Sequence, residues 1–427
     1  MILRNVVFLL ALTLIVGSAS TYVHRKVTRA ANLGRGARRA LAAVLAAAMA
    51  LAVASRMLEH HIPASLLAPL GEVGWVVVLT VFITTVLLLL VDLVTAVARR
   101  FQRLTRSAVP APVAPPASVE PASVASPAPV DPLVSVPAVP AVSPVSRRIF
   151  LSQATTGSAL AIGAGSATYG ALFGRHDYIL EEVAFAIPGL SRRLDGYTLV
   201  QLSDIHLGLF VGEAEMRAAE ALVMRAKPDL LVLTGDLIDH DSRQANNLGR
   251  LVQRLGRYAR DGVVAVPGNH DYYTGIETVV TTLSRAGATV LRNGGRILGD
   301  QGASLALLGV DDPWGPREDA RAVGPDLDAA LAAVPAAADL PRVLLCHNPD
   351  YFPAAAGRVG LQLSGHTHGG QIKVGITPAA LVLRHGFIAG RYTREGSGLY
   401  VNRGFGTAGP PARVGAPPEV TRIVLTV

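Results

Sequence analysis

Residues 199–206 read Leu-Val-Gln-Leu-Ser-Asp-Ile-His, an apolar run that ends in two side chains able to bind a metal ion. The apolar part predicts a buried strand over Thr198–Leu202, so Asp204 and His206 fall just past its carboxyl end. Strand ends are where open α/β sheets collect ligand-binding groups. In an extended Asp-x-His segment both side chains point the same way, and both can reach one centre.

The same pattern recurs four more times along the chain. The further clusters are Gly235-Asp236, Gly268-Asn269-His270-Asp271, His347-Asn348 and Gly365-His366-Thr367-His368-Gly369-Gly370. Each follows a predicted strand, and the strands alternate with helical stretches, which predicts an α/β fold. The predicted strands are Thr198–Leu202, Leu230–Leu233, Val263–Val266, Ser304–Leu308, Val343–Leu345, Gly360–Leu363, Leu399–Asn402 and Thr421–Val427. The predicted helices are Ala214–Arg225, Arg243–Arg260 and Glu277–Ala286.

The residue types in these clusters indicate first-row metal ions. Carboxylates and imidazoles without thiolates suit Mn, Fe or Zn. The single cysteine, Cys346, excludes a disulfide framework and a Cys-rich zinc site. The number of candidate ligands exceeds what one ion needs and fits two.

Each cluster taken alone has a simpler interpretation. Asp236 by itself would be a cap or turn residue, Asn269 a turn residue, and His347 a core or surface histidine. His366 and His368 are harder to dismiss, because they share one glycine-flanked strand end. The joint pattern of five clusters favours a metal site.

Several other polar residues are weaker candidates. Asp311 and Asp312 end a predicted strand and are assigned to a turn, with a place near the site as the alternative. Arg403 and Arg413 could contact a substrate phosphate or be structural. Cys346 is assigned to the core. The segment Asp239-His240-Asp241 is assigned to the approach to the next helix, with a supporting role at the site as the alternative.

The N-terminal part has the composition of a membrane region. Half of all residues are hydrophobic and 16% are charged, too apolar for an ordinary soluble protein. The stretches Val6–Ser20, Ala40–Ser55 and Val73–Ala98 predict a three-span module within residues 1–106. The net charge of +8 arises before residue 176, where 15 Lys and Arg face 5 Asp and Glu. This distribution indicates membrane topology and argues against a nucleic-acid partner.

The basic residues also predict the orientation. Six lie between the first and second stretches and four follow the third, so these segments are assigned to the cytoplasm and the N-terminus to the outside. Residues 107–145, rich in Pro, Ala and Ser, predict an extended linker. Residues 146–175 start with Arg147 and Arg148 ahead of a weakly apolar run, which predicts a twin-arginine-like signal or a fourth transmembrane helix. Both interpretations place residues 176–427 on the extracytoplasmic side of the cell membrane.

The five clusters resemble the motifs of the calcineurin-like metallophosphoesterases: D-x-H, G-D, G-N-H-D/E, H and G-H-x-H. The resemblance covers about residues 195–370, and the surroundings are similar to the membrane-linked YkuE/YaeI-type branch. It implies a four-layer α/β/β/α sandwich over residues 176–427. It also implies that Asp204, His206 and His368 hold one metal, that Asn269, His347 and His366 hold the other, and that Asp236 bridges them. His270 would face the scissile phosphate, and Asp271 would orient its imidazole.

The expected function is hydrolysis of a phosphate mono- or diester by metal-activated water. A lipid-linked or envelope phosphate is inferred from the membrane tether alone. One alternative is a UDP-2,3-diacylglucosamine pyrophosphatase-like hydrolase of lipid A biosynthesis, which would need a cytoplasmic catalytic face. Two others are a non-catalytic receptor or scaffold on a degenerate fold, and a transporter formed by the N-terminal helices. Retention of every motif argues against the scaffold, and the lack of an evident pore argues against the transporter.

Overall fold

The computed structural model describes residues 2–106, 146–300, 302–319, 322–334, 339–374, 377 and 383–427. The chain divides into two compact units, residues 1–39 with 84–162, and residues 40–83 with 163–427. The predicted linker, residues 107–145, lies outside the described residues.

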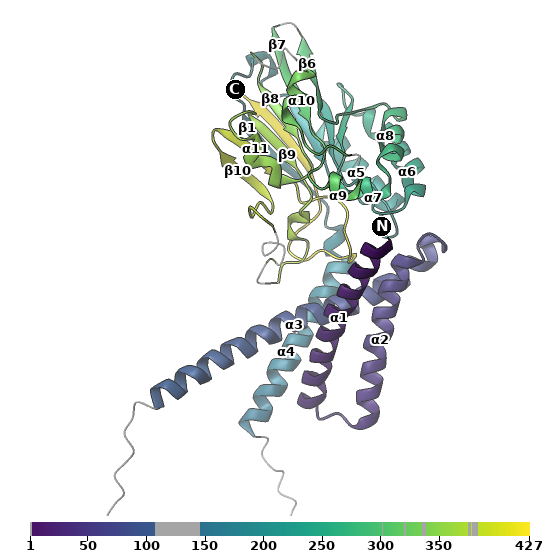
Figure 1. The fold of residues 1–427 in the computed structure, drawn as a ribbon, viewed down its shortest axis with the longest axis vertical. Helices are drawn as coiled ribbons and strands as arrows, with labels where there is room; N and C mark the ends of the chain where they lie inside the picture. Colours follow the sequence, from purple (N-terminus) through teal and green to yellow (C-terminus); the bar gives the residue numbers. More distant parts are fainter. Residues whose placement is uncertain are drawn as a thin grey trace, which may run out of the picture. The chain divides into compact units, whose positions relative to one another are not determined.

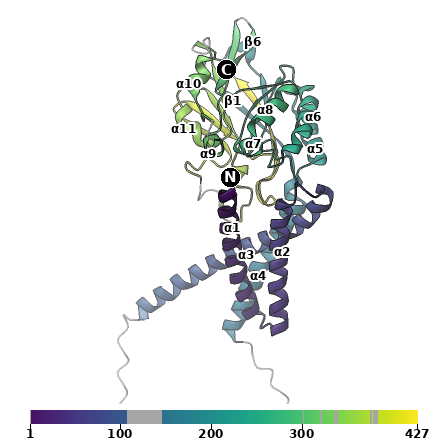
Figure 2. The same cartoon turned by 45° about the vertical axis from the view of Figure 1, so that its right-hand side comes forward.

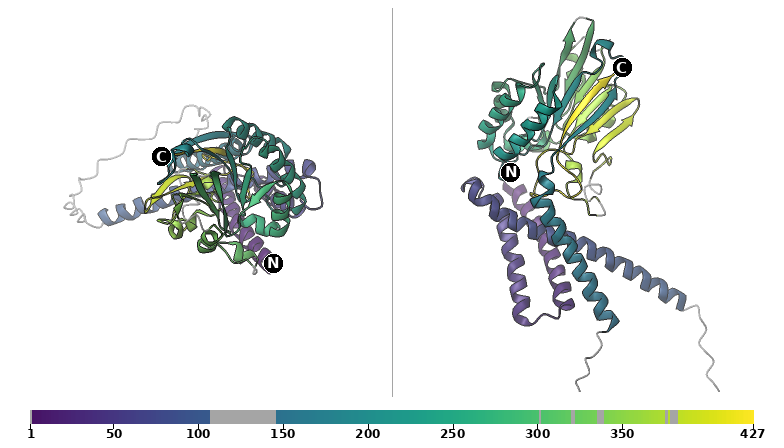
Figure 3. Two further views of the ribbon diagram at one scale, coloured as in Figure 1. Left: turned by 90° about the horizontal axis from the view of Figure 1, so that it is seen from above. Right: turned by 180° about the vertical axis from the view of Figure 1, so that it is seen from behind.

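Four long helices occupy the N-terminal region: α1 (Ile2–Ala30), α2 (Arg35–Met57), α3 (Ala64–Arg106) and α4 (Arg147–Leu172). Within the described residues, two segments are long and apolar enough to cross a membrane, α2 and residues 64–103 of α3. Figure 3 shows α3 as one long helix, although it contains Pro69. Pro69 lies in the second turn of α3, past the free N–H groups of the helix start, so the helix lacks one backbone hydrogen bond there. The prediction that residues 1–106 cross the membrane three times stays a prediction. So does the assignment of residues 146–175 to a twin-arginine-like signal or a fourth transmembrane helix.

The unit of residues 1–39 and 84–162 contains a charged group within its apolar helices. Asp92 of α3 pairs with Lys26 of α1 at 2.6 Å, and the Tyr22 hydroxyl donates to the same carboxylate at 2.7 Å. Pairing lowers the cost of placing a carboxylate in an apolar segment.

Two six-stranded sheets form the centre of the other unit. The first has the order β1-β12-β2-β3-β4-β5 and the second β10-β11-β9-β8-β7-β6. The strands of the first sheet are β1 (Ile179–Ala186), β2 (Thr198–Leu202), β3 (Leu230–Thr234), β4 (Val263–Val266), β5 (Ala288–Val290) and β12 (Glu419–Thr426). Those of the second are β6 (Gly294–Asp300), β7 (Ala303–Gly309), β8 (Arg342–Leu345), β9 (Leu361–Ser364), β10 (Gly390–Arg394) and β11 (Ser397–Val401). In each sheet four strands run parallel, β2 to β5 and β11-β9-β8-β7.

Helices cover the outer face of each sheet. The first is covered by α5 (Glu213–Ala226), α6 (Ala245–Gly256) and α8 (Ile276–Arg285), and the second by α10 (Leu327–Ala332) and α11 (Phe352–Ala355). Figures 1 and 2 show these helix sets on opposite sides of the paired sheets. Apolar side chains of both sheets, such as Leu199, Val232, Leu307 and Leu363, pack into one core between them. The predicted four-layer α/β/β/α sandwich is confirmed.

The structure departs from the predicted elements in two ways. The helix predicted over Arg243–Arg260 is shorter, because Asp241 caps a 3-10 turn (Ser242–Gln244) and α6 ends at Gly256. Four strands were missed: β1, β5, β6 and β10. Strand β1 pairs with β12 over eight residues although more than 200 positions separate them in the sequence, and local pattern carries no signal for such a pairing.

Candidate metal centre

The candidate ligands lie at the carboxyl ends of neighbouring parallel strands in both sheets. In the first sheet, Asp204 and His206 follow β2, Asp236 follows β3, and Asn269 and His270 open α7 (Asn269–Thr274) directly after β4. In the second, His347 follows β8, while His366 and His368 follow β9. The carboxyl ends of parallel strands meet at one edge of a sheet, so the two sheets together present all of these side chains to one place.

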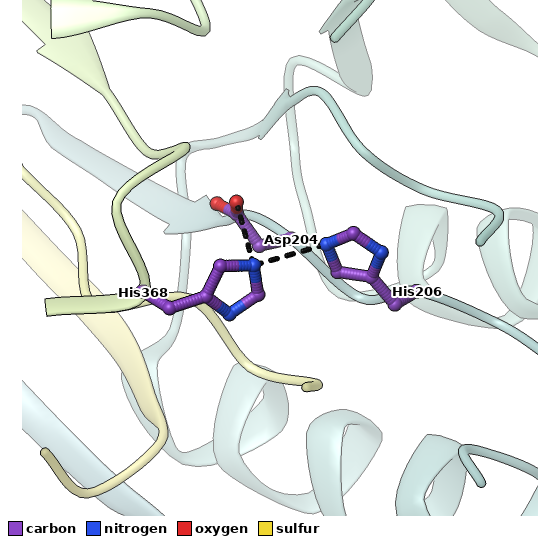
Figure 4. Close-up of side chains that lie close together, drawn as sticks. All are labelled: Asp204, His206 and His368. Carbon is purple, nitrogen blue, oxygen red and sulfur yellow. Dashed lines mark hydrogen bonds and ion pairs between the residues drawn. The ribbon is translucent and has the colours of Figure 1, made fainter. Parts of the chain in front are cut away.

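One group of ligand atoms comprises Asp204, His206 and His368. Figure 4 shows dashed lines from one nitrogen of the His368 ring to the Asp204 carboxylate and to the His206 ring. Its Nε2 lies 3.4 Å from Asp204 Oδ1 and 3.0 Å from His206 Nε2. All three residues are buried.

A second group comprises Asp236, His347 and His366. His347 Nε2 lies 3.2 Å from Asp236 Oδ2 and 3.2 Å from His366 Nδ1. The same carboxylate oxygen is 3.6 Å from His206 Nε2 of the first group. Asp236 therefore reaches both groups with one oxygen.

Oxygen atoms lie at the far side of two of the imidazoles. His347 Nδ1 lies 2.7 Å from the Thr234 carbonyl, which can only accept, so this nitrogen carries the proton and Nε2 offers a lone pair. His206 Nδ1 makes no hydrogen bond to the described residues, but Asp239 Oδ1 faces it at 3.4 Å. A carbonyl or carboxylate behind a histidine is the usual support of a metal-binding imidazole.

The donor set fits divalent cations on these observations. Two ring nitrogens, of His206 and His368, face each other at 3.0 Å, close enough for both to bind one cation. Asn269 Oδ1 is buried and makes no hydrogen bond to the described residues, so an oxygen ligand is available beside the histidines. Oxygen and imidazole donors without thiolate suit first-row divalent ions.

The backbone is strained at several of the candidate ligands that follow the strands. Asp204, His206, Asp236, His366 and His368 all have positive φ, between 50° and 72°, which non-glycine residues seldom adopt. Such strain persists where the surrounding structure enforces it, and it gathers at functional sites. Gly235, at φ +86°, allows the β3 turn to approach closely, because a Cβ there would lie 2.6 Å from Gly268 N and 2.7 Å from His347 Nδ1.

The carboxylate facing His270 belongs to Asp239 and not to Asp271, which corrects the expectation for Asp271. His270 Nδ1 donates to the Asp239 carbonyl at 2.9 Å and lies 3.2 Å from Asp239 Oδ1. Burial by itself lowers the pKa of His270, but the charge of Asp236 and the contacts with Asp239 raise it to about 9. Asp239 thus lies at the candidate site, although the sequence favoured a place on the approach to the next helix. The signal that could have revealed it is its place three residues after Asp236.

Asp271 instead organises the turn that carries Asp236. Its two oxygens accept backbone N–H groups of Asp236 at 3.0 Å, Leu237 at 3.0 Å and Gly268 at 2.9 Å. Its side chain is fully buried. The carboxylate therefore ties the end of β3 to the start of α7, since one residue bonds to both.

The weaker candidates separate into structural and site-lining residues. Arg403 pairs with Glu181 and Glu419, and Asp311 pairs with Arg292, so both have structural partners. Cys346 is buried in the core, as predicted. Arg413 is 1% exposed and binds the carbonyls of Gly406, Arg403 and Ala416, with one nitrogen 3.2 Å from His368 Nδ1.

Asp312 is fully buried, and its Oδ2 has no hydrogen-bond partner among the described residues. Burial is the main cause that raises the pKa of Asp312 to about 7, against a lowering effect of His347. This influence indicates that Asp312 lies toward the metal groups. Asp312 also has the turn role assigned to it, because its Oδ1 accepts the Trp314 N–H at 2.7 Å and its carbonyl accepts the Gly315 N–H at 3.0 Å.

Comparison with known proteins identifies the class. The profile of the calcineurin-like phosphoesterase family matches residues 197–370, the stretch that carries all five clusters. The chain is 31% identical over 293 residues to the uncharacterized metallophosphoesterase YkuE of Bacillus subtilis, covering 66% of this chain and 98% of that protein. The chain therefore belongs to the calcineurin-like phosphoesterase family and is a metal-dependent phosphoester hydrolase.

Two further relatives extend the comparison. The phosphodiesterase YaeI of Escherichia coli is 30% identical, over 66% of this chain and 99% of the relative. A transmembrane protein with metallophosphoesterase domain from Danio rerio is 32% identical, over 62% of each chain. The similarity thus spans nearly the full length of the bacterial relatives and less than two thirds of the fish protein.

Proposed function

We propose that this protein is a membrane-anchored phosphodiesterase that acts through a two-metal centre on a lipid or envelope phosphate outside the cytoplasm. The observation that carries the proposal is the position of Asp236, whose Oδ2 lies within 3.6 Å of ring nitrogens in both ligand groups. A carboxylate shared in this way is the natural bridge between two ions.

The residues are assigned as follows. One ion would be held by Asp204, His206 and His368, and the other by Asn269, His347 and His366, with Asp236 common to both. Two divalent ions at these positions would neutralise the phosphate charge and lower the pKa of the attacking water.

His270 is assigned the role of proton donor to the leaving oxygen. Its side chain is 16% exposed, whereas those of His206 and His347 are fully buried, so a substrate can reach it. With a pKa of about 9 in the metal-free protein, its imidazole holds a proton at neutral pH. Asp239 keeps that ring in place through Nδ1 and leaves Nε2 for the substrate.

Diester hydrolysis is favoured by the similarity to YaeI, which is named a phosphodiesterase. The test uses the full chain in detergent, stripped of metal and reloaded separately with Mn, Fe, Zn or Mg. Bis-p-nitrophenyl phosphate and p-nitrophenyl phosphate are assayed side by side, with Asp236→Asn as control. We expect metal-dependent turnover, faster on the diester and lost in the variant. A protein that neither binds metal nor turns over either compound would overturn the proposal.

Membrane anchoring is supported by α2 and α3, which are apolar enough to span a membrane, and by the relatives named transmembrane proteins. The side of the membrane can be tested by cysteine labelling, because the natural Cys346 is buried and gives little background. We expect an impermeant maleimide to label Arg217→Cys in intact cells, but Arg38→Cys only after lysis. The reverse pattern would place the catalytic domain in the cytoplasm.

The lipid substrate is inferred from the tether alone and needs its own test. Vesicles of phosphatidylglycerol can be mixed with the metal-loaded protein in detergent, and product release followed by phosphorus NMR. Turnover of the lipid well above that of the water-soluble diester would support the assignment. Turnover of the soluble diester alone would contradict it.

A further inference from the structure

We infer that Arg56, at the end of the apolar helix α2, is a positioning residue of the metal centre. It acts through Asp239, which contacts both His206 and His270. The inference rests on the proposed function and deepens it, because it makes the helical region part of the active site and not only an anchor.

The first step is the ion pair between Arg56 and Asp239. Arg56 Nη2 lies 2.6 Å from Asp239 Oδ2, and the two side chains are 19% and 6% exposed. The guanidinium also lies over the Phe210 ring, 5.8 Å from its centroid, and 3.5 Å from Glu59. Arg56 is thus held on three sides, and a shielded pair of this kind interacts far more strongly than one in water.

The second step leads from Asp239 to the metal groups. While Oδ2 faces Arg56, Oδ1 lies 3.4 Å from His206 Nδ1 and 3.2 Å from His270 Nδ1. One carboxylate therefore stands behind a candidate metal ligand and behind the proposed proton donor. If its other oxygen lost Arg56, a buried anion would have only histidines to balance it, and rotation toward them or protonation would change how both rings are held.

The third step concerns how the segment between α2 and α3 is fixed to the catalytic domain. Arg243 donates to the carbonyls of Glu59 and His60 at 2.6 and 2.7 Å, and it pairs with Asp241. Arg243 thus secures the same segment as Arg56, but it makes none of the contacts to the site histidines. The chain therefore contains a matched control that separates docking of the segment from positioning of Asp239.

The experiment compares Arg56→Gln, Arg56→Lys and Arg243→Gln in the full chain in detergent. Co²⁺ binding to the metal-free protein is followed by its visible absorption, and kcat and KM for bis-p-nitrophenyl phosphate are measured on the loaded protein. We expect Arg56→Gln to weaken Co²⁺ binding and lower kcat by about tenfold each, the lower end of effects for groups behind metal ligands, with KM unchanged. Arg56→Lys should recover kcat to within about threefold, since a single ammonium can face Oδ2. Arg243→Gln should change kcat by less than about twofold, as its contacts are at the surface.

A double-mutant cycle with Asp239→Asn completes the test. We expect Arg56→Gln to add nothing to the loss that Asp239→Asn causes, because both changes act through one carboxylate. Additive losses, equal losses in Arg56→Gln and Arg243→Gln, or unchanged kcat and Co²⁺ binding in Arg56→Gln would each overturn the inference. A wild type without Co²⁺ binding or turnover would instead overturn the proposed function, so the two failures are distinguishable.

Discussion

The two sheets supply the site from matching positions but with different chemistry. The first sheet presents Asp204-x-His206 after β2, and the second presents His366-x-His368 after β9, and all four residues have positive φ. All of the carboxylates in the two ligand groups come from the first sheet, whereas the second contributes only imidazoles. The first sheet thus supplies the negative charge that cations require, and the second supplies neutral donors that complete each group.

The largest effect is expected from removing the shared carboxylate of the first sheet. Asp236→Asn should lose both ions and lower kcat/KM by about a thousandfold, because one oxygen serves both groups. Metal analysis of the dialysed protein, together with bis-p-nitrophenyl phosphate turnover, measures both quantities. A variant that kept two ions and full rate would contradict the assignment of Asp236.

A matching change in the second sheet should be less severe. His347→Ala removes a donor from one group only, so we expect about one ion to remain and activity to fall by about a hundredfold or somewhat more. The same metal analysis decides the comparison. If His347→Ala emptied both positions as Asp236→Asn does, the sheets would not differ in the way described.

His270 provides a third case, because it follows β4 of the first sheet but is not assigned to either ion. His270→Ala should keep both ions and lower kcat by about a hundredfold through loss of the proton donor. Turnover of esters with leaving groups of different acidity provides the check. The loss should shrink for leaving groups that need no proton, and an equal loss for all esters would argue against this role.

Among these four substitutions, the smallest effect on kcat is expected for Asp271→Asn. Asp271→Asn places an amide group against backbone N–H donors, so the free energy of unfolding should fall by about 2 kcal/mol. Because the Asp271 carboxylate does not face His270, kcat per bound metal should fall by less than about tenfold. Thermal unfolding and metal-normalised kinetics separate the two quantities. A stable variant with a large loss of kcat would restore the catalytic role first expected from the sequence.

Much of the fold and of the candidate ligand set could be predicted from the sequence, for a physical reason. A buried parallel strand is a short apolar run, and the polar residues that follow it must lie at its carboxyl end, so the clusters at Asp204, Asp236, Asn269, His347 and His366 could be read in order. The pairing of β1 with β12 could not be predicted, because it joins distant segments and the local pattern of each does not indicate which strand it pairs with.

Contacts between side chains were the least predictable part of the site. Asp239 was assigned to the approach to the next helix because it lies five residues past the end of β3, away from the strand-end clusters. The contact of Arg56 with Asp239 could not be predicted, since no sequence pattern links an arginine to a carboxylate 183 positions further on. Asp271 was given to His270 as its neighbour, whereas the short helix α7 directs its carboxylate toward the backbone of the β3 turn.

The central claim is that Asp236 joins two ions into one centre. The most direct measurement is electron paramagnetic resonance of the full chain loaded with Mn²⁺, with the metal content determined on the same sample. We expect two Mn²⁺ per chain and an exchange-coupled spectrum that Asp236→Asn abolishes. Two Mn²⁺ giving only the six-line signal of isolated ions, or a single ion per chain with full activity, would contradict it.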